Sequence, residues 1–127
     1  TLLQSSQWKC NNEYWNFNLN GELTIENQGN PEGASPPERW ATRMIGTYSE
    51  KGSSLITIIN RLVVTSATPS DMQVAVSAGL SDFSQESITH YKMQLESRNL
   101  SLVQIKRNTN GKERTPKKTP TQCIKVQ

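Results

Sequence analysis

His90 is the only histidine in the 127-residue chain, so a serine-type catalytic triad would have to be built around it. Such a triad needs a carboxylate that orients the imidazole, and the only aspartates are Asp71 and Asp82. Alternation along residues 88–96 places His90 on the opposite side of a strand from Tyr91. We therefore expect His90 on the outer surface, and the sequence identifies no catalytic residue.

The carboxylates give no stronger indication of an enzyme or a metal site. Two of them could flank a glycosidic bond, but nothing in the spacing of the glutamates selects a pair. One histidine, two widely separated cysteines and scattered acidic residues form no ligand cluster, and the chain has no glycine-rich phosphate loop. The sequence thus predicts a protein that is not an enzyme and needs neither a metal nor a cofactor.

Cys10 and Cys123 are the only cysteines, and they lie near opposite ends of the chain. A zinc knuckle or a CxxC redox motif needs cysteines that are close in sequence. If these two are oxidised, they tie the first structured segment to the last, which stabilises the fold by about 4–5 kcal/mol in the simplest loop-entropy model. We expect this disulfide; two buried free thiols of an intracellular protein are the alternative.

Asn99 begins the N-glycosylation sequon Asn99-Leu100-Ser101, which has meaning only in a secreted chain. Together with the expected disulfide it favours an oxidising, extracellular compartment. No apolar run has the length of a membrane span, and Thr1 does not begin a signal peptide. The sequence therefore predicts a secreted module, as a mature segment or an excised piece, without membrane insertion.

The composition predicts a single domain over residues 1–127 with a thin core, because only 33% of the residues are hydrophobic. Charge is distributed unevenly along this domain. From Lys106 onward seven basic residues accompany one acidic residue, a net charge of +6, whereas the preceding part has seven basic and ten acidic residues, a net charge of −3.

The basic segment near residues 106–121 has three interpretations. A nucleic-acid arm is disfavoured because no aromatic residue is interleaved with the basic ones, and Pro116 and Pro120 interrupt them. A contact with a heparin-like polyanion suits a secreted protein better. The simplest interpretation is a solvated hairpin or linker that turns at Asn110-Gly111.

Short alternating segments predict a β-protein. Residues 14–26 are typical of a hairpin, with Trp15, Phe17 and Leu19 on one half-buried face and a turn at Asn20-Gly21. Residues 54–68 are the strongest β-forming stretch and are apolar on both alternations from Leu55 to Ile59, which predicts a central strand or an edge used by a partner. Further strands are expected at 41–48 with a possible bulge at Gly46, at 72–76, at 88–96, and at 100–106 paired with 122–126.

The remaining segments are expected to be loops and turns. Residues 27–38 have the glycines and prolines of a long loop, and Trp40 is expected to pack beneath it, with an exposed binding anchor as the alternative. Residues 79–87 are expected to form a turn with at most one helical turn, capped by Ser81 or Asp82. About eight short strands and no convincing helix are the pattern of a β-sandwich or a small barrel.

The stretches QWKCNNEYWNFNLNGELTIENQGNPEGASPPERW and TPTQCIKVQ resemble the ZP-N-type repeats of the abalone egg vitelline envelope receptor for sperm lysin. ZP-N domains are Ig-like β-sandwiches, so the resemblance implies that fold for this chain. Cys10 matches the first cysteine of the family and Cys123 its fourth, which are bridged to each other there. The inner cysteine pair of the family has no counterpart in this sequence.

The resemblance implies a structural and recognition module of an egg-coat glycoprotein, located in the extracellular egg coat. Its partners would be neighbouring repeats of the same filament and the sperm protein lysin, which would bind it during species-specific fertilization. Because lysins are strongly basic, we expect the binding face on the acidic part of the chain and the basic segment pointing away. The candidate contact residues are Met44, Tyr48, Ile56, Ile58 and Trp40.

Two other extracellular β-modules compete with this interpretation. An adhesion domain of the usual immunoglobulin kind bridges two mid-sheet strands, whereas these cysteines lie at the chain ends. A lipocalin-like carrier of a small ligand needs a cavity, and a hydrophobic content of 33% argues against a large apolar one. Nucleic acid and membrane are not expected as partners of any of these modules.

Overall fold

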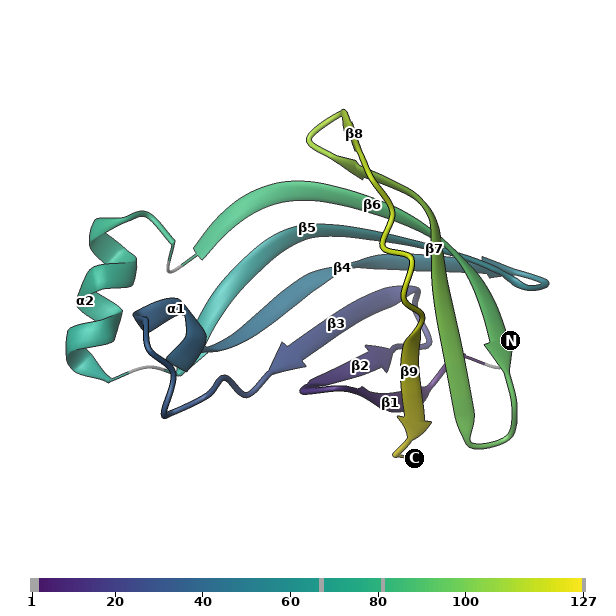
Figure 1. The fold of residues 1–127 in the computed structure, drawn as a ribbon, viewed down its shortest axis with the longest axis horizontal. Coiled ribbons are helices and arrows are strands. Elements are labelled where there is room, and N and C mark those ends of the chain that lie inside the picture. Colours follow the sequence, from purple (N-terminus) through teal and green to yellow (C-terminus); the bar gives the residue numbers. More distant parts are fainter. Residues whose placement is uncertain (1–2, 67, 81, 127) are drawn as a thin grey trace.

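The computed structural model describes residues 3–66, 68–80 and 82–126, and it shows an all-β chain with two short helices (Figure 1). The predicted all-β class is therefore confirmed. The elements are β1 (Ser6–Cys10), β2 (Glu13–Phe17), β3 (Glu22–Asn27), α1 (Pro36–Arg39), β4 (Ala41–Lys51), β5 (Ser54–Ser66), α2 (Pro69–Ser77), β6 (Asp82–Leu95), β7 (Asn99–Thr109), β8 (Lys112–Arg114) and β9 (Thr121–Lys125).

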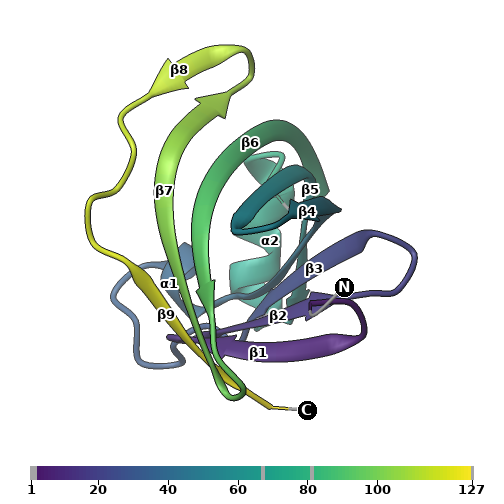
Figure 2. The same cartoon turned by 90° about the vertical axis from the view of Figure 1, so that its right-hand side faces the viewer.

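Eight of these strands form a closed antiparallel barrel. Strands β1 to β7 pair in chain order, and β9 pairs with both β7 and β1, so the sheet has no free edge along this circuit. Figure 2 looks along the barrel and shows the strands as a ring. The short strand β8 pairs with β7 alone and extends the sheet outside the ring.

The expected Ig-like sandwich is wrong. A sandwich needs two sheets that pack face to face, whereas here the last strand returns to the first and closes a single sheet on itself. The small barrel, which the strand count also allowed, is the fold that forms. The correction follows from long-range pairing, since the local strands themselves lie largely where the alternation predicts them.

The clearest local predictions are confirmed. Strands β2 and β3 form the hairpin with Asn20-Gly21 in its turn, where Gly21 has a φ of +85°. The inward position expected for Leu19 is wrong, because β2 ends at Phe17 and Leu19 is exposed beside the turn. Strand β5 lies between β4 and β6, and the β4–β5 register shifts at Gly46. Strand β7 pairs with β9 as expected, and Asn110-Gly111 turns the chain from β7 into β8.

The strand expected at residues 72–76 is wrong, because these residues lie in helix α2. The alternating Met72 and Val74 suggested a strand, but a cap fixes the helix: the Thr68 hydroxyl accepts a hydrogen bond from the Asp71 backbone N–H, and Pro69 begins the first turn. The turn expected at residues 79–87 is also too long. Strand β6 already begins at Asp82, so that residue caps no helix, and the cap suggested at Ser81 lies outside the described residues.

The end of the barrel that holds the β2–β3 turn is densely filled, and we call it the closed end. Leu3, Phe17, Leu23, Leu55 and Leu100 are fully buried there. Burial of each such side chain stabilises the fold by about 1.5–3 kcal/mol relative to exposure. This end is the principal core.

At the opposite end, β4, β5 and β6 continue past the ring as an arm that carries the two helices (Figure 1). Trp40, Val64 and Ala75 form a second, smaller buried cluster there, with Met72 packed against it. Trp40 is therefore not the exposed binding anchor of the alternative, and its buried neighbours belong to β5 and α2. An ion pair at 2.8 Å between Arg39 and Asp71 joins α1 to α2.

The predicted disulfide is confirmed, and it lies in the seam that closes the ring. Cys10 of β1 and Cys123 of β9 are directly paired and bonded to each other.

Over the part of the chain that the structure describes, neither helix has the length and apolar character that a membrane crossing requires.

Candidate functional site at the barrel mouth

We call the mouth the end of the barrel where the β6–β7 ladder stops, at the pair Ser87 and Thr109. Next to this pair, the Asn110 backbone N–H still donates to the Glu86 carbonyl at 2.8 Å and the Glu86 N–H donates to the Asn110 side chain at 2.9 Å. Beyond these contacts β6 continues with β5 towards the helices, whereas β7 turns away into its hairpin with β8 (Figure 1). The separation of the two strands leaves the inner wall of the barrel accessible at this place.

A hollow of about 180 Å³ lies at the mouth. Its polar lining comes from Ser87, Thr109, Gln85 and Arg61, which is ion-paired with Asp82, and Met44, Ile59 and Leu62 contribute apolar side chains. Ile59 is directly paired with Ser87, and directly paired residues of antiparallel strands have their side chains on the same face. The hollow is therefore formed by the inner wall of the barrel.

A β-bulge directs Arg107 to the inner wall. The β6–β7 register shifts between His90 and Tyr91, so that Tyr91 pairs with Gln104 while Thr89 pairs with Arg107. Thr89 is buried at 6% exposure and faces inward, and Arg107 shares its face. Arg107 thus lies one inward position deeper than Thr109, which lines the hollow.

The guanidinium of Arg107 lacks a complete set of partners. Its Nε is buried and has no hydrogen-bond partner, which is an unfavourable state for a charged donor. The ion pairs of the described residues are Arg39–Asp71, Arg43–Glu26 and Arg61–Asp82, and none of them includes Arg107. An arginine in this condition is suited to an anionic or carbonyl oxygen supplied from outside the chain.

The hairpin of β7 and β8 adds two further cations to the same face. Arg114 pairs with Arg107, and Lys112 pairs with Thr109, so both side chains lie on the face that continues the inner wall. Like charges directly opposite each other destabilise a strand pair. Glu113 pairs with Asn108 and lies on the other face, where it does not neutralise them.

Trp15, Tyr91 and Glu13 form the inner wall below the mouth. The rings of Trp15 and Tyr91 meet edge to face with centroids 6.2 Å apart, and the Trp15 indole N–H donates to Glu13 at 3.3 Å. Burial raises the pKa of the Tyr91 hydroxyl, the Glu13 charge acts in the same direction, and Thr89 and Arg107 partly oppose it. The hydroxyl therefore stays protonated at neutral pH, and both charges act on the same interior space.

The predicted contact residues do not form one surface. Met44 lines the hollow, Tyr48 is buried at the closed end with its hydroxyl donating to the Asn18 carbonyl at 2.7 Å, and Trp40 is buried in the arm. Ile56 and Ile58 are half-buried and alternate with the buried Leu55 and Thr57, so they lie on the outer face of β5. Their role in partner binding stays a prediction.

Asn99 and His90 both lie outside the barrel interior. Asn99 is exposed at the start of β7, a position that a glycan could reach, and its modification stays a prediction. His90 alternates with the buried Thr89 and Tyr91 and therefore faces outward, as the sequence indicates.

Sequence reasoning missed Arg107, Arg114 and Glu13 as site residues. The sequence places Arg107 in a solvated basic segment, and simple alternation from the buried Leu100 and Leu102 would turn it outward because it gives no sign of the bulge. The pairing of Arg114 depends on the same register. The one sequence signal that points to this site is the concentration of basic residues after Lys106.

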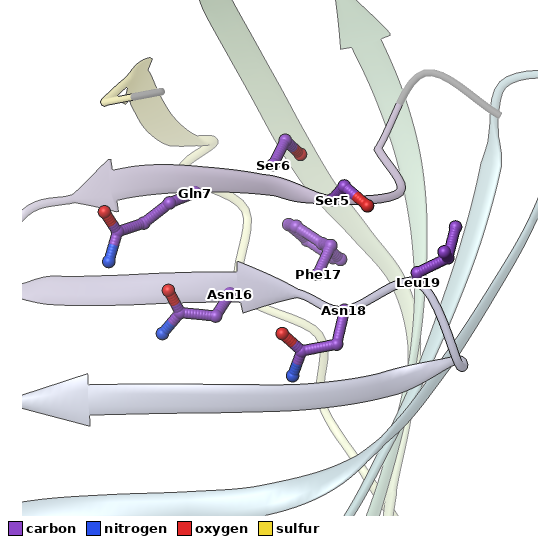
Figure 3. A pocket seen from close by; sticks show the side chains of 7 residues that line it. All are labelled: Ser5, Ser6, Gln7, Asn16, Phe17, Asn18 and Leu19. Carbon is purple, nitrogen blue, oxygen red and sulfur yellow. The ribbon is translucent and has the colours of Figure 1, made fainter.

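A second hollow, of about 380 Å³, lies at the edge of β1 and β2 near the closed end. Gln7 and Asn16 are directly paired there, and their amides lie side by side with that of Asn18 (Figure 3). All three amides are neutral, and none contains a buried unpartnered atom. The mouth is therefore the stronger candidate, because it combines charge with an unsatisfied buried donor.

Within the described ranges, no group of three histidine, cysteine or acidic side chains is arranged to hold a metal ion. Comparisons of the chain with protein-family models, curated proteins and solved structures find no match.

Proposed function

We propose that this protein is a non-enzymatic binding barrel that holds a small organic ligand at its mouth. The observation that carries the proposal is the hollow at the mouth, with its apolar wall of Met44, Ile59 and Leu62. Arg107, whose Nε is buried without a partner, does not line the hollow itself but lies two residues from Thr109, which does. Eight-stranded antiparallel barrels have an interior wide enough either to be filled by side chains or to hold one small ligand. In this barrel, side chains fill the interior at the closed end, whereas the mouth contains a hollow.

The size of the hollow limits what it can hold. Ligand pockets for drug-sized molecules measure about 300–1,000 Å³, whereas this hollow has about 180 Å³. It accommodates one aromatic ring or a short alkyl chain against Met44 and Ile59, with the rest of the ligand at the rim. The low hydrophobic content that argued against a large apolar cavity is compatible with a ligand of this kind.

Titration with the neutral fluorophore N-phenylnaphthylamine, whose emission rises in an apolar site, tests the proposal. Ile59→Trp fills the hollow, and Ile58→Trp is its matched control because Ile58 lies on the outer face of the same strand. We expect the wild type and Ile58→Trp to bind the probe and Ile59→Trp to lose binding. Equal binding by both variants, or none by the folded wild type, would contradict the proposal.

The role expected from the sequence resemblance, an egg-coat recognition module bound by sperm lysin, is a second proposal. The Cys10–Cys123 disulfide is compatible with the extracellular location that this role requires. The barrel gives it less support than a sandwich would, because the resemblance implied an Ig-like fold. Glycosylation at Asn99 and association with neighbouring repeats belong to the same proposal.

A pull-down with purified lysin tests this second role directly. The half-buried Ile56 and Ile58 remain its accessible candidates, since Trp40 and Tyr48 are buried. We expect Ile56→Asp with Ile58→Asp to abolish capture if the role is real, whereas neutralising Lys112, Arg114, Lys117 and Lys118 leaves it unchanged. Capture that depends on the four basic residues instead would contradict the assignment of the face.

A further inference from the structure

We infer that the ligand of the mouth is a soluble amphipathic anion, whose acidic head group binds Arg107 and Arg114 while its apolar part enters the hollow. This inference rests on the proposed function and adds the chemical class of the ligand. It goes beyond a general affinity for polyanions, because it assigns the binding to one face of the β7–β8 hairpin.

The basic side chains of the β7–β8 hairpin are divided between its two faces. Arg107, Arg114 and Lys112 share the hairpin face that continues the inner wall, because they pair through Arg107–Arg114 and Thr109–Lys112. Lys106 pairs with the outward-facing His90 and lies on the other face of the same strand. The hairpin therefore presents its cations selectively to the mouth, although the whole segment is basic.

The electrostatic state of this face favours an anion. Arg107 and Arg114 are directly opposite each other without an acidic residue between them, and the Arg107 Nε is buried and unpartnered. A carboxylate, sulfonate or phosphate oxygen placed between the two guanidinium groups removes the repulsion and satisfies the buried donor at once. Arginine is the side chain best suited to such two-pronged contacts.

The neighbouring apolar wall determines the rest of the ligand. Thr109, which pairs with Lys112, is itself part of the lining of the hollow, and Met44, Ile59 and Leu62 supply its apolar side. A head group held by the hairpin is therefore adjacent to a place for one ring or short chain. Glu13, on the inner wall across from these cations, disfavours a second acidic group deeper in the barrel.

Two fluorophores that differ in one group test the inference. Anilinonaphthalene sulfonate carries a sulfonate, and N-phenylnaphthylamine has the same rings without it. We expect the wild type to bind the sulfonate at least 10-fold more tightly, because a charge-assisted hydrogen bond contributes about 1.5–3 kcal/mol. Arg107→Gln with Arg114→Gln should remove this preference and leave affinity for the neutral probe within about twofold.

Lys106→Gln with Lys92→Gln is the matched control, since it removes the same number of charges from the outer faces of β7 and β6. We expect it to leave the affinity for both probes within about twofold. Near-ultraviolet circular dichroism of each variant establishes that its side chains are packed as in the wild type, so that the sulfonate probe does not report a partly unfolded chain.

The outcomes separate this inference from the proposed function. Equal binding of both probes to the wild type would overturn the anionic ligand while leaving the binding barrel intact. Equal losses of affinity for the sulfonate probe in the two double variants would also overturn it, because the loss would then follow the net charge of the protein and not the position of the arginines. If the protein sediments with anionic phospholipid vesicles with an affinity equal to that for the sulfonate probe, the inference of a soluble ligand is overturned. If the folded wild type binds neither probe, both proposals are overturned.

Discussion

The two ends of this barrel use the same strands for different purposes. At the closed end Leu3, Phe17 and Leu55 are fully buried, and polar groups have partners: the Trp8 indole donates to the Ser6 hydroxyl at 2.8 Å, and the Leu3 N–H donates to Glu50 at 3.3 Å. At the mouth the inner wall carries Arg107 with a buried unpartnered donor.

The difference separates residues that stabilise the fold from residues that are available to a ligand. Buried polar groups in folded proteins are nearly always hydrogen-bonded, so each exception needs an explanation. Trp40 Nε1 in the arm and Asn108 Oδ1 are also buried without a partner, and Arg107 Nε differs from them in belonging to a charged group on the inner wall. Stability and function often conflict at such sites, because a binding surface keeps groups that the isolated chain does not satisfy. The comparison therefore predicts opposite effects of mutation at the two ends.

The largest expected effect concerns the seam that both ends share. Cys10→Ala with Cys123→Ala removes the cross-link over almost the whole chain, and we expect the free energy of unfolding to fall by about 4–5 kcal/mol in the loop-entropy model. Urea denaturation measures this change. A loss below about 1 kcal/mol would show that packing at the closed end alone keeps the barrel closed.

The closed end should respond strongly to loss of side-chain volume. Phe17 is fully buried and contacts Tyr48 edge to face with ring centroids 5.0 Å apart, so Phe17→Ala should lower the unfolding free energy by about 3–5 kcal/mol. Leu19→Ala, two residues along and 69% exposed, is the control and should change it by less than about 0.5 kcal/mol. Similar losses from both variants would remove the distinction between core and surface here.

The helices of the arm should loosen in acid before the closed end does. The hydrogen bonds and charge of Arg39 lower the pKa of Asp71, so the ion pair contributes stability above the ordinary aspartate pKa and loses it as pH falls through the lowered value. The protection factors of the α2 amides, which correct for the slower intrinsic exchange in acid, should therefore fall below about pH 4. Arg39→Gln should remove this pH dependence, and unchanged dependence in that variant would refute the assignment.

The smallest effect on stability is expected at the mouth. Arg107→Met keeps an unbranched side chain and removes the unsatisfied charge, so the free energy of unfolding should stay unchanged or rise by about 1 kcal/mol. Chemical denaturation of this variant beside Phe17→Ala gives the contrast directly. A loss above about 2 kcal/mol would mean that Arg107 stabilises the fold, and the comparison between the two ends would fail.

Much of the local structure could be predicted from the sequence. The alternation of Trp15 and Phe17, the Asn20-Gly21 turn and the apolar stretch of β5 all depend on neighbouring residues, and the structure confirms them. The disulfide was also predictable, since only two cysteines exist. Helix α2 was missed because its residues also alternate, although the Thr68 cap was a visible signal.

The closure of the barrel and the site could not be predicted in the same way. Sandwich and barrel use the same short strands and differ in long-range pairs such as β9 with β1, which local alternation does not determine. The direction of Arg107 depends on one bulge opposite His90 and Tyr91. A shift of one residue reverses every side chain beyond it, so the residues most important for binding were the least predictable.

Chemical-shift mapping with anilinonaphthalene sulfonate tests most directly whether the mouth is the binding site. We predict that added probe shifts the backbone amide resonances of Ile59, Ser87, Arg107 and Thr109 and leaves those of Gln7, Asn16 and Phe17 unchanged. Shifts concentrated on Gln7 and Asn16 instead would place binding in the second hollow, at β1 and β2, and contradict the account.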